Sequence, residues 1–191
     1  MVAAAMAAAW SLLPTLREVA VDNLPAEDLT AVGSAGLESL KVRRGPRLTS
    51  LRGADRLTSL RVLQLDSLRN LKSLDGLEVL SVLEVLHLEA LPHVTRLDHV
   101  AQLPRLRYLD LIDLKNVESL APLAGHPTLA YVMFPPTSDM DPEPLRSIPN
   151  LKMVMAGCPR RWKASLAGLP VREDFGDDDP VFVEWARLNP R

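Results

Sequence analysis

Residues 57–111 contain one pattern three times: LTSLRVLQL (57–65), LSVLEVLHL (80–88) and LPRLRYLDL (103–111). The leucines recur in register at a spacing of 23 residues. A fixed period of this length predicts a solenoid, in which each unit is one coil that buries its apolar side chains against its neighbours. The period therefore predicts the architecture before the local propensity of any residue is considered.

The pattern continues in both directions from this stretch. Leu37, Leu40 and Val42 precede it at the same spacing, and Leu129, Val132 and Phe134 follow it. With spacings of 21 and 22 residues, Leu16-Val19-Val21 and Leu151-Val154-Ala156 complete the series. The sequence thus predicts about seven repeats with parallel strands near 16–22, 37–43, 60–66, 83–89, 106–112, 129–134 and 151–156.

The L-x-x-L-x-L core, as in Leu60-Leu63-Leu65, resembles the leucine-rich repeat family. The resemblance implies an α/β fold: a right-handed solenoid with a parallel β-sheet on its concave face and a non-catalytic role in binding other proteins. Between strands the apolar residues recur every third position, as in Leu68, Leu71 and Leu74. That period is too short for a straight α-helix, so we expect 3₁₀ or irregular turns on the convex face.

One position departs from the usual family pattern. Three residues after the second leucine of each strand, where many repeats carry Asn or Cys, this chain has mainly leucine, as at Leu68 and Leu91. A ladder of side-chain hydrogen bonds is therefore missing at this corner. We expect Asn70 and Asn116, two residues further on, to substitute for it in part.

Length and composition favour one domain over residues 1–191, with repeats over 14–158 between an N-terminal cap (1–13) and a C-terminal cap or tail (159–191). The C-terminal segment is expected to close the core with its aromatic side chains: Trp162, Phe175, Phe182 and Trp185. Residues 1–13 are apolar but lack the basic start of a signal peptide, since the first basic residue is Arg17. Export remains the alternative interpretation of that segment.

Charge and motifs restrict the classes of function. A net charge of −2 and one cysteine, Cys158, disfavour nucleic-acid binding and a disulfide-stabilised secreted fold, so the sequence favours a cytoplasmic monomer that does not bind membranes. No phosphate-binding loop, nucleophile elbow or zinc motif occurs. We therefore expect no enzyme activity, cofactor or metal, and the acidic run 173–179 is interpreted as a solvated loop.

Residues between the strand leucines should point away from the core and line the concave face. The face divides into a charged N-terminal half and an apolar C-terminal half. The residues predicted to bind a partner are Val85, His87, Tyr108, Asp110, Ile112, Tyr131, Met133, Met153 and Met155. The charges predicted to steer association are Lys41, Arg43 and Arg61. Exposed tyrosine and methionine are typical of protein-binding surfaces, unless the C-terminal tail covers them and makes them core.

The sequence favours a non-catalytic scaffold that binds a partner protein on its concave face. A narrower version is an inhibitor or immunity-type protein that masks an enzyme. The alternative is an exported carbohydrate or cell-surface binding module, although the concave positions contain no tryptophan. An enzyme would need a pocket around His87, Glu89 and Asp110, which we interpret instead as polar surface residues because no nucleophile accompanies them.

Overall fold

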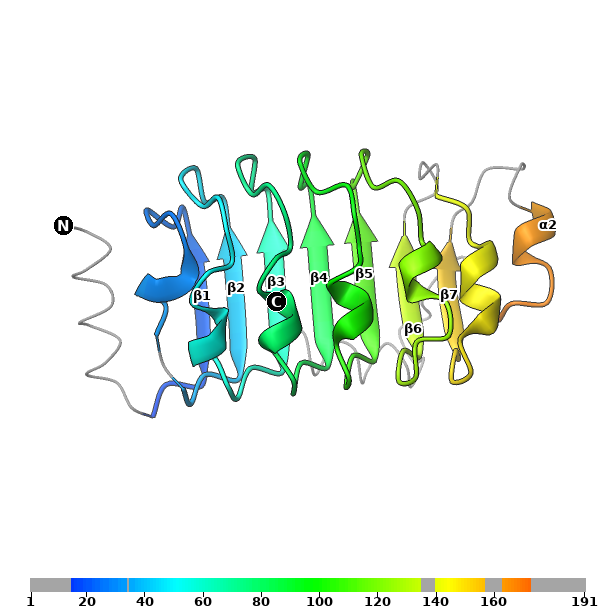
Figure 1. Cartoon of the computed structure of the whole chain (residues 1–191), viewed down its shortest axis with the longest axis horizontal. Helices are drawn as coiled ribbons and strands as arrows, with labels where there is room; N and C mark the ends of the chain where they lie inside the picture. The colour runs from blue at the N-terminus through cyan, green and yellow to red at the C-terminus, as the bar shows by residue number, and fades with distance from the viewer. Residues whose placement is uncertain (1–14, 34, 135–139, 157–162, 173–191) are drawn as a thin grey trace.

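The computed structural model describes residues 15–33, 35–134, 140–156 and 163–172, which form one open sheet backed by short helices. Eight parallel strands stand side by side in chain order (Figure 1). They are β1 (Glu18–Asp22), β2 (Ser39–Arg43), β3 (Val62–Asp66), β4 (Val85–Glu89), β5 (Tyr108–Ile112), β6 (Tyr131–Phe134), β7 (Met153–Ala156) and β8 (Val171–Arg172). The seven predicted strands are confirmed; each begins two residues later than predicted and ends at the predicted residue.

Neighbouring strands pair without a register slip, so equivalent residues of successive repeats lie side by side. Leu63 pairs with Leu86, and Leu86 pairs with Leu109. Because side chains alternate across a strand, this register places the leucines in continuous rows on the inner face and the intervening residues in rows on the outer, concave face. The repeat is therefore reproduced residue by residue in space.

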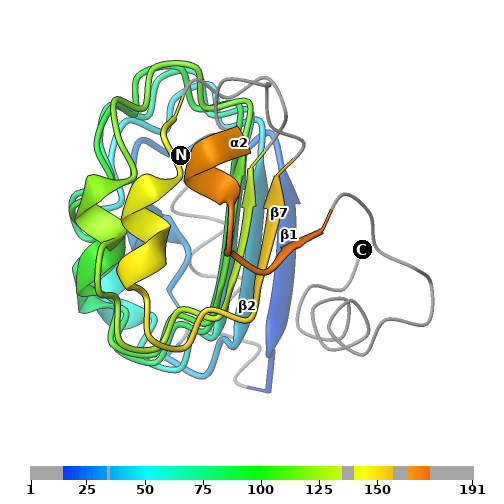
Figure 2. The same ribbon diagram turned by 90° about the vertical axis from the view of Figure 1, so that its right-hand side faces the viewer.

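From β1 to β7 the chain returns from one strand to the next through 3₁₀ turns, which form the layer opposite the sheet (Figure 2). They are η1 (Leu29–Ala31), η2 (Ala54–Arg56), η3 (Leu77–Val79), η4 (Val100–Gln102), η5 (Ala121–Leu123) and η6 (Glu143–Ser147). The predicted thin convex side is confirmed. The return segments adopt 3₁₀ geometry because an apolar residue at every third position matches its three residues per turn.

The core is a stack of fully buried leucines, among them Leu63, Leu86 and Leu109. Burial of one such side chain stabilises the fold by about 1.5–3 kcal/mol before the loss of conformational entropy is counted. The corner that follows each strand, where leucine replaces the usual Asn or Cys, is also inaccessible to solvent, since Leu68 and Leu91 are buried. Asn70 and Asn116 each donate a hydrogen bond of 2.6 Å to a carbonyl of the preceding coil, as expected.

Each of the first five strands is followed directly by a residue with left-handed backbone geometry. These residues are Asn23, Arg44, Ser67, Ala90 and Asp113. The backbone N–H of Ser67 donates to the carbonyl of Glu89 at 3.0 Å, and that of Ala90 donates to Ile112 at 3.0 Å. The turn therefore extends the sheet ladder by one hydrogen bond while it directs the chain into the convex layer.

The described chain adds one strand to the seven predicted ones, within the segment that was predicted to be a C-terminal cap or tail. A short helix, α2 (Lys163–Leu166), leads into β8, which pairs in parallel with β7. Leu166, Leu169 and Val171 are partly buried and pack against the core. The predictions for residues 1–13, Cys158, the four cap aromatics and the acidic run lie outside the described residues. No helix of the described part is long and apolar enough to cross a membrane.

Candidate functional site

The first row of the concave face is buried, which corrects the expectation that it is exposed. Its buried members are Val62, Val85, Tyr108, Tyr131 and Met153. Val85 is 0% exposed and Tyr108 is 1% exposed. The in-register strands place these side chains against one another, so they form a second apolar cluster. Four predicted contact residues are therefore packing residues in this structure.

The two tyrosines at the centre of this row form a stacked pair. The ring centroids of Tyr108 and Tyr131 are 4.4 Å apart and the rings are inclined by 14°. The guanidinium carbon of Arg107 lies 5.5 Å from the centre of the Tyr108 ring, and Lys152 Nζ lies 5.9 Å from the centre of the Tyr131 ring. Offset stacking and cation–π contacts both favour this arrangement.

The other two rows of the concave face hold the accessible part of the predicted surface. The second row contains Ala20, Lys41, Gln64, His87, Asp110, Met133 and Met155, and the described members of the third row are Asp22, Arg43, Asp66, Glu89 and Ile112. His87, Ile112, Met133 and Met155 are half-buried, and Asp110 is buried. Met133 pairs in register with Asp110 on one side and with Met155 on the other. The sheet thus brings the two methionines together on adjacent strands, where they present apolar, adaptable side chains.

His87 lies between two carboxylates of the same face. Its Nδ1 is 3.3 Å from Oδ2 of Asp110, and its Nε2 is 3.2 Å from Oε2 of Glu89. Burial alone lowers the pKa of His87, but the hydrogen bonds and charges of Asp110 and Glu89 outweigh it and raise the pKa above the ordinary value of 6.5. The protonated ring can donate to both carboxylates at once. Because both nitrogens face carboxylates, neither is directed at a position for a reacting substrate.

The three predicted steering charges do not form one group. Arg43 Nε lies 3.2 Å from Oδ2 of its in-register neighbour Asp66 on the concave face. Lys41 is half-buried on the same face, beside Gln64. Arg61 lies instead at the N-terminal edge of the sheet, where it forms a bidentate contact with Glu84 at 2.9 and 3.1 Å. Arg61 lies at this edge because it precedes Val62, the first residue of β3.

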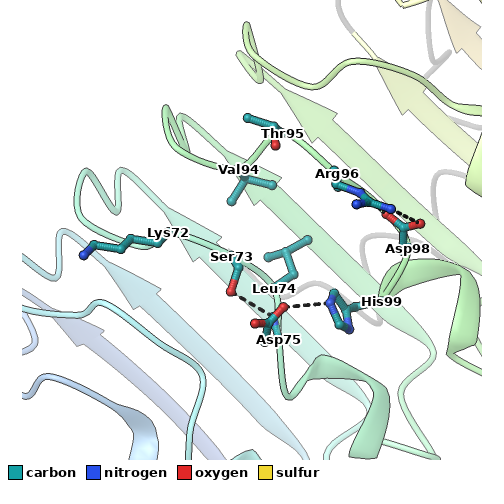
Figure 3. Close-up of a pocket in the computed structure, with 9 residues that line it drawn as sticks. All are labelled: Lys72, Ser73, Leu74, Asp75, Val94, Thr95, Arg96, Asp98 and His99. Atoms are coloured by element: carbon teal, nitrogen blue, oxygen red, sulfur yellow. Dashed lines mark hydrogen bonds and ion pairs between the residues drawn. The ribbon is translucent and has the colours of Figure 1, made fainter.

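A cavity of about 290 Å³ lies between the coils that follow β3 and β4 (Figure 3). Two pairs of its side chains are in contact: Arg96 with Asp98 at 2.8 Å, and His99 Nε2 with Asp75 at 2.7 Å. The other nitrogen of His99, Nδ1, lies 2.9 Å from Glu78. His99 therefore links two coils. It occupies the repeat position held by Gly53 and Gly76 in earlier coils.

Sequence reasoning did not identify His126, which replaces a leucine of the repeat. It stands 23 residues after Leu103 and is buried, with Nδ1 accepting a hydrogen bond of 3.2 Å from the backbone N–H of Leu129. Burial lowers the pKa of His126, and the backbone of Leu103 and Val100 offsets only part of that effect. The break in the leucine register was the signal for this residue. Within the described ranges no cluster of His, Cys, Asp and Glu has the arrangement of a metal site.

The fold has counterparts among solved structures. An internalin (InlF) of Listeria monocytogenes matches with a TM-score of 0.53 and 18% identity, over 76% of this chain and 49% of that chain. This chain thus spans about half the length of that internalin. Internalin C2 of the same organism matches with a TM-score of 0.51 and 20% identity, over 84% and 80% of the two chains. No family model and no curated protein matches the sequence.

At these identities the likeness concerns the fold. The parallel sheet, the 3₁₀ return turns and the 23-residue spacing define a leucine-rich repeat solenoid. This chain therefore has the leucine-rich repeat fold.

Proposed function

We propose that the protein is a non-catalytic scaffold that binds a partner protein through the second and third rows of its concave face. The observation that carries the proposal is the half-exposed pair Met133 and Met155 on adjacent strands, beside the charged residues of β3 to β5. Methionine adapts to a partner surface at low steric cost, and the neighbouring charges favour one orientation. The buried first row, which contains Tyr108 and Tyr131, packs beside this surface and holds its strands together.

The charged half of the surface is organised by ion pairs between neighbouring strands. Arg43 contacts Asp66, and His87 contacts Asp110. A pre-organised charged surface loses little conformational entropy on binding, because its side chains are already held. These residues should therefore contribute to orientation and association rate, while the apolar pair contributes buried area.

The test compares apolar surface positions on the two opposite faces of the solenoid. Met133→Arg and Met155→Arg place charges on the concave rows, whereas Val79→Arg changes an exposed apolar residue of the convex turn η3. Loss of a central apolar anchor costs about 2 kcal/mol or more of binding free energy. Partner binding should therefore fall at least tenfold for the methionine variants and stay unchanged for Val79→Arg. Equal binding by all three variants would exclude the concave rows.

An inhibitor or immunity-type role is the narrower form of this proposal. It requires that the bound partner is an enzyme and that the complex blocks its active site. An activity assay of the captured partner, with and without the scaffold, tests that form separately from binding. The proposed location is the cytoplasm, which the single cysteine supports.

A further inference from the structure

A row of seven residues, six of them charged, lies at the N-terminal edge of the sheet, one residue before each of the strands β1 to β7. The row runs Arg17, Glu38, Arg61, Glu84, Arg107, Ala130 and Lys152. Backbone hydrogen bonds hold it in register: the N–H of Val85 donates to Arg61, and the N–H of Tyr131 donates to Arg107, both at 2.9 Å. The signs alternate along its first five members. Cations and carboxylates therefore meet on neighbouring coils.

Two pairs of this row are in contact. Arg17 Nε is 3.6 Å from Glu38, and Arg61 approaches Glu84 to 2.9 Å. The alternation then stops at Ala130, where a third carboxylate would complete the series. Ala130 lies between Arg107 and Lys152, so two cations flank a position without an acidic side chain.

A cavity of about 400 Å³ lies at this break. Arg105, Arg107 and Lys152 line it, together with Thr128 and Ala130, and Glu84 is the one carboxylate among its described lining residues. Glu84 is held by Arg61 on the preceding coil. Within the part of the chain that the structure describes, Arg105 and Lys152 form no ion pair, and both are exposed.

Two of the cations also lie near aromatic rings, which favour their positions. Arg107 and Lys152 lie against the rings of the stacked pair Tyr108 and Tyr131. The tyrosines are buried, so their rings restrict where the cationic groups can move. A cation held in position binds an anion with a smaller loss of side-chain entropy than a mobile surface lysine does.

We propose that this edge cavity binds a carboxylate of an acidic peptide segment of a partner protein, which takes the place of the acidic side chain missing at position 130. The same row supplies the precedent, because Glu84 accepts three hydrogen bonds from Arg61 of the preceding coil. A nucleic acid fits less well. The cavity carries only a local basic cluster, Glu84 lies in its wall, and the chain as a whole has a net charge of −2.

The experiment measures binding of a capped tetraglutamate peptide to the full chain by calorimetry at low salt. Lys152→Glu and Arg105→Glu reverse charges at the cavity, and Arg69→Glu makes the same change at an exposed residue outside its lining. The peptide should bind wild type and Arg69→Glu equally, and each cavity variant about tenfold more weakly, since each replaces attraction by repulsion. Added salt should weaken the binding to wild type.

A second variant supplies the missing group from within the chain. Ala130→Glu should complete the alternating row and so prevent the peptide from binding, with Lys152 and Arg105 unchanged. Because Ala130 is buried, this variant is first checked for a cooperative thermal transition, and the exposed cavity variants decide the question if it does not fold. The proposal is overturned if wild type does not bind the peptide, if the cavity variants bind it as well as Arg69→Glu does, or if a thymidine oligonucleotide binds more tightly. It does not depend on the concave rows, so the methionine variants should bind the peptide normally.

Discussion

His87 and Asp110 occupy equivalent places on adjacent strands, and the sheet register brings Nδ1 of the histidine to 3.3 Å from Oδ2 of the aspartate. Glu89 contacts the other ring nitrogen from the same strand. The ring is only 14% exposed, so solvent screens these contacts weakly. One imidazole thus links two strands of the charged surface, and its protonation controls the strength of that link.

The first prediction concerns the pH dependence of this link. Because the pKa of His87 is raised in the folded chain, the folded state holds the proton more tightly than the unfolded state does. The stabilisation is complete below the ordinary pKa of 6.5 and is lost as the pH rises through the folded value. The melting temperature of His87→Gln should therefore differ from that of wild type more at about pH 6 than at about pH 9. His93→Gln, at an exposed position, is the control and should show no such trend. A difference that grows with pH would contradict the assignment.

His126 should act with the opposite sign. Its pKa is lowered by burial, so the folded chain keeps the ring neutral while the unfolded chain binds a proton as the pH falls through 6.5. His126→Asn preserves an acceptor for the N–H of Leu129 and removes the titration. The variant should lose less unfolding free energy than wild type between about pH 7 and about pH 5, measured by urea denaturation at each pH. An identical loss in both proteins would show that His126 is not the titrating group.

Gly53 and Gly76 form a matched pair for a prediction about backbone strain. Both precede a 3₁₀ turn, with φ of 95° and 93°. A Cβ at position 53 would lie 2.5 Å from the backbone nitrogen of Thr30, whereas one at position 76 would meet nothing closer than 3.5 Å. Gly76→Ala should lower the unfolding free energy by about 1–2 kcal/mol through strain in φ alone. Gly53→Ala should cost clearly more, because the neighbouring coil must also move. Equal denaturation midpoints would rule out the steric contribution.

The last prediction compares the stability contributed by the buried row of the concave face with that contributed by its accessible residues. Tyr108→Ala removes a buried ring from the second apolar cluster and should lower the unfolding free energy by about 3 kcal/mol or more. Met133→Ala changes a half-buried side chain and should cost about 1 kcal/mol. Leu109→Arg, which places a charge in the leucine core, should abolish cooperative unfolding. Thermal melts of the three variants test this order. If Tyr108→Ala were as stable as wild type, the tyrosine row would be surface.

The residues that the sequence analysis assigned to the core are those whose burial depends on local periodicity. Apolar residues, mostly leucine, stand at the equivalent strand positions and at about every third position of the return segments, and they can all be buried in only one register of stacked coils. The period therefore predicted the strand ends, the parallel order and the rows of the concave face. It also predicted that Asn70 and Asn116 would act at the leucine corner, because each recurs at the same place in its coil.

Contacts between different rows, and between charged groups on successive coils, were decided by the tertiary structure. The repeat alone predicts that Tyr108 and Arg61 lie outside the leucine core. It does not predict that the tyrosine is buried and stacked, or that the arginine pairs with Glu84 at the edge of the sheet. The position of His87 between two carboxylates likewise depends on side-chain geometry across two strands. Periodicity specifies which face a side chain occupies, because that is set by the backbone. Its solvent exposure and its ionic partner depend on which neighbours lie within a few ångströms, and only the packed structure supplies those distances.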